Sequence, residues 1–250
     1  MGPQRASKLY LSQHGDAKSF RVTLYGSLAA TGKGHMTDIA IQDVLSPVAP
    51  VKIVWKPEEV LGFHPNAVMF ETDKGEPWAA YSVGGGALSE GNNPTGILPE
   101  STNVYDLTHL VDIKNWCERY GRTYWEYVDK CEDSSIWDYL QMIWETMQEA
   151  VERGLEGEGA LPGPLNLQRK AFTYYVKAKG YKQSLQTRAL VYSYALAVSE
   201  ENASGGTIVT APTCGASGVM PAVLYHLSRG HGFSDRKVIH ALATAGLIGN

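Results

Sequence analysis

The spacing of hydrophobic residues changes near residue 100, and this change constrains the fold more than any other feature of the sequence. Between Phe20 and Leu88, apolar and polar residues alternate in short runs, which is typical of half-buried strands. After Asn103, apolar residues recur at helical spacing over long stretches. The sequence therefore predicts an α+β fold, in which a small α+β domain at residues 1–100 is followed by a mostly α-helical domain at residues 101–250.

Individual elements can be predicted within each domain. The alternation predicts strands at 20–25, 51–55, 68–71 and 78–83, with a polar hairpin turn at 73–77. A helix is expected at 37–45, where the apolar residues share one face. Four long helices are expected later in the chain, at 105–120, 136–155, 186–201 and 237–249.

Composition excludes several classes of partner. The 250 residues carry a formal net charge of −4, which does not suit a nucleic-acid or anionic-membrane surface. No apolar run approaches the roughly 18 residues of a membrane span. The first residues lack the apolar core of a secretory signal, so a cytoplasmic location is expected. The three cysteines, Cys117, Cys131 and Cys214, form no CxxC pair, which disfavours a disulfide framework and a closed zinc site.

One segment combines a cysteine with a turn of small residues. Residues 207–210 are mostly β-branched, residues 211–218 are mostly small, and Pro221 lies where the first turn of a helix is expected. A helix N-terminus favours a thiolate, which is the form of Cys214 that would bind a metal. From the residues alone, a buried structural cysteine in a tight turn is an equally good interpretation.

Two glycine-containing segments are also candidates. Lys33 and His35 lie in a predicted glycine-rich loop at 26–38, where they would be able to hold a carboxylate and move a proton. The loop departs from the phosphate-binding P-loop pattern, and a plain surface turn is the alternative. Gly84, Gly85 and Gly86 offer backbone donors for an anion, although such a run is also typical of a linker.

Other polar and aromatic groups have simpler interpretations. Trp116, Trp125, Trp137 and Trp144 are expected in the helical core. Glu145, Glu149, Glu152 and Glu156 are expected on a solvated helical face. His226, His231 and His240 are too scattered for a recognised metal motif.

Taken in order, these segments and others resemble the iron–sulfur-dependent L-serine dehydratases, also called L-serine ammonia-lyases. Each match is weak alone, but the ordered set spans nearly the whole chain and is specific. The matching segments are LYGSL (24–28), TGKGH (31–35), TD (37–38), FHPN (63–66), YSVGGG (81–86), LPG (161–163) with Arg169, ENA (201–203) and TAPTCGASGVMPAVL (210–224).

The resemblance implies an activity and a cofactor. The family converts L-serine to pyruvate and ammonia with a [4Fe–4S] cluster, one iron of which acts as a Lewis acid on the substrate. It implies Cys214 as a cluster ligand, His35 in proton transfer or substrate contact, and Lys33 at the substrate carboxylate. Substrate-binding positions are implied at Gly84, Gly85, Gly86, Thr213 and Ser217. It also implies a homodimer, whereas net charge and the lack of a long apolar run argue against a nucleic acid or a membrane as partner.

The chain departs from the family pattern at the cluster turn. Many relatives read Asn-Gly-Ala-Cys-Gly where this chain has Cys214 at the first of these positions and Ser217 at the fourth. The ligand position is therefore Cys214 or Ser217, and Cys214 is favoured because iron binds thiolate in preference to a hydroxyl.

The resemblance also implies that both ends of the family sequence are missing. A Ser-Ser-Ser-His-Thr segment precedes Met-Gly-Pro in the family, and further cluster ligands would lie beyond Asn250. One alternative is therefore an incomplete fragment that binds a small anion or a partner chain. Another, with Lys33 as Schiff-base lysine, is a pyridoxal-phosphate-dependent dehydratase, although the spacing of the glycines disagrees with it.

Overall fold

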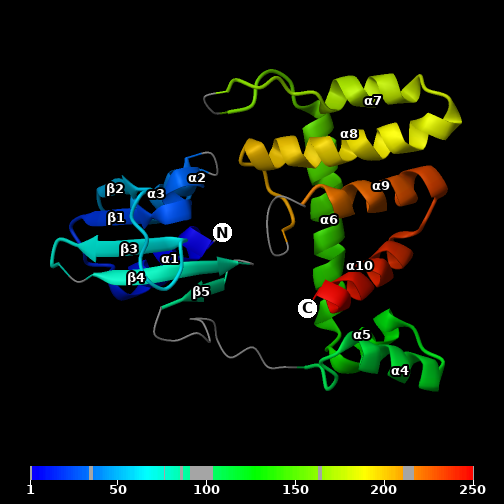
Figure 1. The fold of residues 1–250 in the computed structure, drawn as a ribbon, viewed down its shortest axis with the longest axis horizontal. Helices are drawn as coiled ribbons and strands as arrows, with labels where there is room; N and C mark the ends of the chain where they lie inside the picture. The colour runs from blue at the N-terminus through cyan, green and yellow to red at the C-terminus, as the bar shows by residue number, and fades with distance from the viewer. Residues whose placement is uncertain are drawn as a thin grey trace. The chain divides into compact units, whose positions relative to one another are not determined.

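The computed structural model describes residues 2–33, 36–75, 77–84, 87–90, 104–162, 165–210 and 217–249. These residues divide into two compact units (Figure 1). The first unit holds the described residues up to position 90, together with residues 162, 165, 166 and 210. The second unit holds all the other described residues. An α+β fold, with strands in the N-terminal part and helices in the C-terminal part, is therefore confirmed.

The first unit is built on a five-stranded sheet with the strand order β2-β1-β3-β4-β5. Strand β1 pairs in parallel with β2, whereas the β1–β3, β3–β4 and β4–β5 pairs are antiparallel. The elements of this unit are α1 (Gly2–Gln13), β1 (Phe20–Tyr25), α2 (Gly26–Gly32), α3 (Thr37–Leu45), β2 (Val51–Lys56), β3 (Ala67–Thr72), β4 (Trp78–Gly84) and β5 (Ala87–Ser89).

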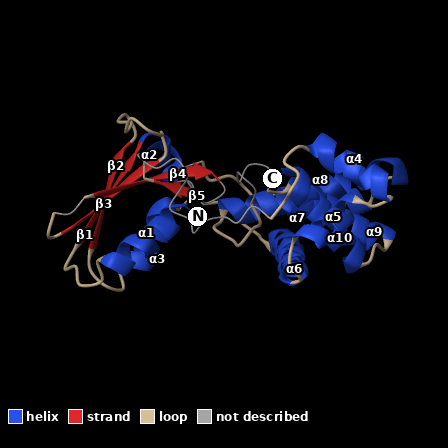
Figure 2. Ribbon diagram, turned by 90° about the horizontal axis from the view of Figure 1, so that it is seen from below, coloured by secondary structure: helices blue, strands red, loops and turns tan. Residues whose placement is uncertain are grey.

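Helices α1 and α3 cover one face of this sheet, as Figure 2 shows. Phe20, Val22 and Leu24 of β1 alternate along the strand, and all three are buried in the core under these helices. Tyr10 of α1 packs against Phe70 of β3, with 5.2 Å between the ring centroids. The alternation of apolar residues that the sequence shows here thus corresponds to the face of the sheet that packs on the core.

Two expectations for the first unit are wrong. The predicted loop after β1 is instead the short helix α2, because Gly26 with φ +51° turns the chain sharply and helix-forming residues follow. Gly84, expected in a loop, instead ends strand β4 and pairs with Ala87 of β5. Its two glycine neighbours, Gly85 and Gly86, lie outside the described residues.

The second unit is helical throughout its described elements. Helix α6 is its longest, and α8, α9 and α10 all pack against it (Figure 1). Trp144 of α6 is fully buried at the centre of the core. The helices are α4 (Leu110–Tyr120), α5 (Tyr124–Cys131), α6 (Ser135–Glu156), α7 (Ala171–Lys179), α8 (Gln183–Ala203), α9 (Val219–His231) and α10 (Asp235–Gly249).

Close packing of α6 on α8 depends on a glycine. A Cβ atom at Gly154 would collide with the backbone carbonyl of Ala197, so the two helices approach each other backbone to backbone at this point. This contact fixes the C-terminal parts of α6 and α8 side by side.

Among the described residues, no helix combines the length and the apolar character needed to cross a membrane.

Candidate functional site

The structure describes only some of the residues that the sequence places in a site. Lys33, Gly84 and Ser217 are described, and the first two belong to the first unit. Ser217 belongs to the second unit. The remaining expected residues lie outside the described part of the chain, and these are His35, Gly85, Gly86, Thr213 and Cys214.

Lys33 follows helix α2 directly and is exposed. Its Nζ atom lies 5.6 Å from the centroid of the Trp55 ring on β2, which is a cation–π distance. Gly32, just before it, packs closely on the same ring: a Cβ atom there would lie 2.7 Å from the Trp55 side chain. The lysine is therefore oriented by the sheet while its charge stays accessible to solvent.

Ser217 lies at the end of the predicted cluster turn and is buried. The next residue, Gly218, is the N-cap of α9, and Pro221 falls in the first turn of that helix as predicted. Gly218 packs tightly on α8, since a Cβ atom there would lie 2.5 Å from the Ala195 carbonyl oxygen and 3.2 Å from the Ser199 hydroxyl. Gly218 is thus fixed against α8 at the point where the N-terminal N–H groups of α9 begin.

Four charged side chains and one hydroxyl gather at the C-terminal end of α8, in a group that we call the α8-end cluster: Arg153, Arg169, Glu200, Glu201 and Ser204. Arg153 of α6 donates from Nε to Glu201 Oε2 (3.0 Å) and from Nη2 to the Thr207 carbonyl (2.8 Å). Arg169 donates from Nη2 to the Ser204 hydroxyl. Its Nη1 lies 3.9 Å from Glu201 Oε1, which is an ion pair without a hydrogen bond.

Glu200 is the most buried acidic residue of this cluster, with 2% of its surface exposed. Its Oε1 accepts hydrogen bonds from the backbone N–H groups of Lys170 (2.6 Å) and Ala171 (3.1 Å). These N–H groups belong to the start of α7, so the carboxylate satisfies donors that a helix N-terminus leaves open. Its Oε2 is buried and has no hydrogen-bond partner among the described residues.

Glycines make room for this cluster. A Cβ atom at Gly157 would collide with the Arg169 guanidinium, and one at Gly206 would collide with the Glu201 carboxylate. Two segments that match the family separately in the sequence, the one with Arg169 and the one with Glu201, therefore meet in space. Sequence reasoning missed Arg153 and Glu200, because nothing in their local pattern marks them.

The described residues do not supply the ligands of a metal cluster. They contain no group of three or more His, Cys, Asp or Glu side chains that would hold a metal ion. Cys117 is buried in the core of the helical unit, and burial raises the pKa of its thiol, which favours the protonated form. A cluster would need Cys214 and further ligands from outside the described residues.

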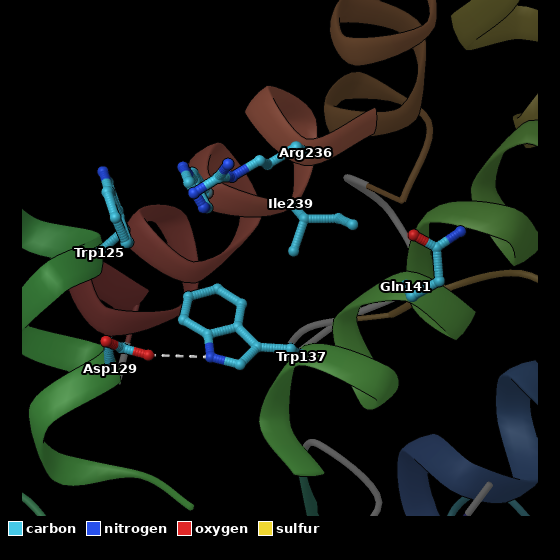
Figure 3. A pocket seen from close by; sticks show the side chains of 7 residues that line it. Trp125, Asp129, Trp137, Gln141, Arg236 and Ile239 are labelled. Carbon is cyan, nitrogen blue, oxygen red and sulfur yellow. Dashed lines mark hydrogen bonds between the residues drawn. The ribbon is translucent and has the colours of Figure 1, made fainter. Parts of the chain in front are cut away.

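A cavity apart from the predicted site residues that the structure describes lies among α5, α6 and α10, and Figure 3 shows its lining. Its volume is about 550 Å³. Trp125 and Trp137 were expected in the core; they pack against it but are only partly buried, and they line this cavity. None of the predicted site residues that the structure describes lines it; the lining residues are Trp125, Asp129, Trp137, Gln141, Arg236, Ile239 and His240.

Comparison with known proteins identifies the family. The model of the serine dehydratase alpha chain matches residues 33–250, and that of the serine dehydratase beta chain matches residues 1–53. The chain belongs to the serine dehydratase family. Family membership confirms the resemblance inferred from the ordered motifs. The beta-chain match ends within β2, so the five-stranded sheet extends beyond it.

Curated relatives agree with this serine dehydratase assignment. The chain is 32% identical to L-serine dehydratase TdcG of Escherichia coli strain K12. It is 31% identical to an L-serine dehydratase of Mycobacterium bovis and 30% identical to one of Streptomyces coelicolor. Each alignment covers 100% of this chain and 67% of the relative.

Proposed function

We propose that this chain acts in the deamination of L-serine to pyruvate and ammonia. The observation that carries this proposal is the match to serine dehydratase family models along the chain, together with alignment of the whole chain to two thirds of relatives named L-serine dehydratase. The fold is compatible with it, because Gly218 packs on Ala195 and Ser199 of α8, the helix whose C-terminal end carries the α8-end cluster.

The proposal includes an iron–sulfur cluster as cofactor, with Cys214 as the ligand that this chain provides. When bound, such a cluster supplies a Lewis acid that makes the serine hydroxyl a better leaving group. Support comes from the α9 N-terminus that follows the turn, which favours a thiolate there. The remaining ligands would come from outside the described residues, since these contain no suitable group.

The chain's own residues have proposed roles around the substrate. Lys33 holds the substrate carboxylate, which agrees with its exposed charge and its fixed place beside Trp55. His35 removes the proton from the serine Cα. Backbone donors of residues 84–86 and 213–217 orient the substrate anion.

Anaerobic reconstitution with iron and sulfide tests this proposal. The treated chain should gain the broad visible absorbance of a cluster and release pyruvate from L-serine, as followed by a coupled lactate dehydrogenase assay. Cys214→Ala should lose both signals. The matched control Cys131→Ala, at a partly buried cysteine, should retain both.

Three outcomes would contradict this proposal in whole or in part. Pyruvate release that requires added pyridoxal phosphate would support a pyridoxal-phosphate dehydratase instead. Visible absorbance that survives Cys214→Ala would remove Cys214 as ligand, and a Ser217→Cys variant would then test the neighbouring position. Absence of both absorbance and turnover would support an incomplete fragment that only binds a small anion or a partner.

The role of His35 has its own readout. His35→Asn should abolish pyruvate formation and leave the cluster absorbance intact, because the histidine moves a proton and binds no iron. Full activity of this variant would exclude His35 as the base.

A further inference from the structure

A small cavity opens next to Glu200 in the helical unit. Its volume is about 220 Å³, which is below the roughly 300 Å³ of pockets that take drug-sized ligands. An occupant must therefore be small. Leu167, Gln168, Lys170 and Ser199 are exposed, so the cavity reaches the surface; its other lining residues are Leu161, Leu196 and Glu200.

The carboxylate of Glu200 is held in one orientation at the wall of this cavity. Two backbone N–H groups at the start of α7 bind Oε1, at 2.6 and 3.1 Å. The carboxylate cannot rotate without losing both bonds. Its Oε2 is buried and has no hydrogen-bond partner among the described residues, although a buried charged oxygen without one is costly. This oxygen lacks a donor, and Glu200 is one of the residues that line the cavity.

The remaining walls define the rest of the occupant. Leu161, Leu167 and Leu196 provide apolar surface, which suits an aliphatic chain. Lys170 also lines the cavity and is exposed, so a negative group of the occupant would be tolerated near the mouth. A primary ammonium group meets the Glu200 requirement best, since it donates several charge-assisted hydrogen bonds.

We propose that this cavity binds a small aliphatic primary ammonium compound, of which an α-amino acid with an aliphatic side chain is the natural class. Its ammonium group donates to Glu200 Oε2, and its aliphatic chain packs on the three leucines. The proposal is independent of serine turnover, because serine has no aliphatic side chain to fill the apolar wall.

Three related probes separate the two parts of the site. L-Leucine carries the ammonium, the carboxylate and the aliphatic chain; 3-methylbutylamine lacks the carboxylate, and 4-methylpentanoate lacks the ammonium. Isothermal titration calorimetry on the full chain should show binding of the first two. It should show weaker binding of 4-methylpentanoate than of 3-methylbutylamine, because the acid has no ammonium group to donate to Glu200.

A nearly isosteric substitution tests the role of Glu200. In Glu200→Gln the amide oxygen still accepts from the Lys170 and Ala171 N–H groups, whereas the amide NH₂ cannot accept from an ammonium. Loss of one charge-assisted hydrogen bond should weaken binding of L-leucine and 3-methylbutylamine by roughly tenfold or more. The matched control Glu118→Gln, at an exposed residue of α4, should bind like the unmodified chain.

Several results would overturn the proposal. These are equal binding by Glu200→Gln, binding of 4-methylpentanoate as strong as that of the amine, and no binding of either amine by the unmodified chain. Ammonium chloride serves as a further competitor. If it displaces 3-methylbutylamine at equal concentration, the site binds the ammonium ion alone, and the proposed contact of an aliphatic chain with the three leucines is wrong. Far-UV circular dichroism checks that Glu200→Gln remains folded.

Discussion

Two histidines of the helical unit have pKa values below the ordinary range, mainly because of burial. His226 has a buried Nε2 without a hydrogen-bond partner among the described residues, and burial lowers its pKa, with a smaller contribution from His231. His240 stacks on Trp125, with 3.8 Å between the ring centroids. Burial lowers the pKa of His240 as well, followed by the charge of Arg236. Both imidazoles are therefore favoured in the neutral form.

These directions predict a loss of stability in weak acid. Below the ordinary histidine pKa of about 6.5, the unfolded chain binds protons that the folded chain binds only at lower pH. The free energy of unfolding should therefore fall as the pH decreases from about 6.5 through the lowered values. His240→Phe keeps a ring on Trp125 and removes one titrating group, so thermal melts at several pH values should show a weaker pH dependence. An unchanged dependence would contradict this reasoning.

Only those parts of the candidate site that have a recognisable local sequence pattern were predictable. The turn around Ser217 and the proline of the following helix were visible as small residues before a helix start. Arg153 and Glu200 were not, because their partners are distant in sequence: Arg153 binds Glu201, 48 positions away, and Glu200 binds Lys170, 30 positions away. No periodicity encodes such pairs, since they arise from the packing of α6, α7 and α8.

At the scale of elements, the contact between α6 and α8 depends on Gly154. A side chain there would meet the backbone of Ala197, which cannot move without displacing α8. Gly154→Ala should destabilise the fold by about 1–3 kcal/mol, the usual cost of overpacking, as measured by urea denaturation.

Gly246 is a matched control, at which substitution by alanine should change the stability in the opposite direction. Gly246 lies inside α10 with no atom within 4 Å of its added Cβ. Gly246→Ala should stabilise the fold by about 0.5–1 kcal/mol, because alanine has the higher helix propensity and the lower backbone entropy when unfolded. Effects of the same sign and size in both variants would contradict a specific role for the contact between Gly154 and Ala197.

Element boundaries were predictable in part. The helix expected at 37–45 agrees with α3 at Thr37–Leu45. The helix expected at 105–120 begins later, at Leu110, and α5 was missed. Its start is nevertheless marked by a capping box, in which the Glu126 carboxylate accepts from the Thr123 N–H at 2.8 Å. That hydrogen bond is the main reason that the pKa of Glu126 is lowered to about 2.

At the scale of the whole molecule, each unit has its own hydrophobic core. The core of the sheet unit centres on Tyr10, Phe20 and Phe70, and the core of the helical unit centres on Trp144. Separate cores imply separate stabilities, because the burial of apolar surface is the main driving force for folding.

Removal of one core side chain should therefore act on one unit. Phe70→Ala, at a fully buried position, should destabilise the sheet unit by about 3–5 kcal/mol. Hydrogen exchange followed by mass spectrometry should show faster exchange in β1, β3 and β4, with α6 and α8 unchanged. Faster exchange of equal size in both units would show that they unfold as one.

The mixed pairing of the sheet has a consequence for the order of folding. Strands β3 and β4 are joined by a short turn, so their antiparallel pairing closes a small loop. The parallel pairing of β1 with β2 must instead enclose the 25 residues from Gly26 to Pro50, including α2 and α3. Closing the longer loop costs more chain entropy before any contact compensates for it. The hairpin is thus the natural nucleus, because the pairings of β1 with β2 and of β1 with β3 both close longer loops.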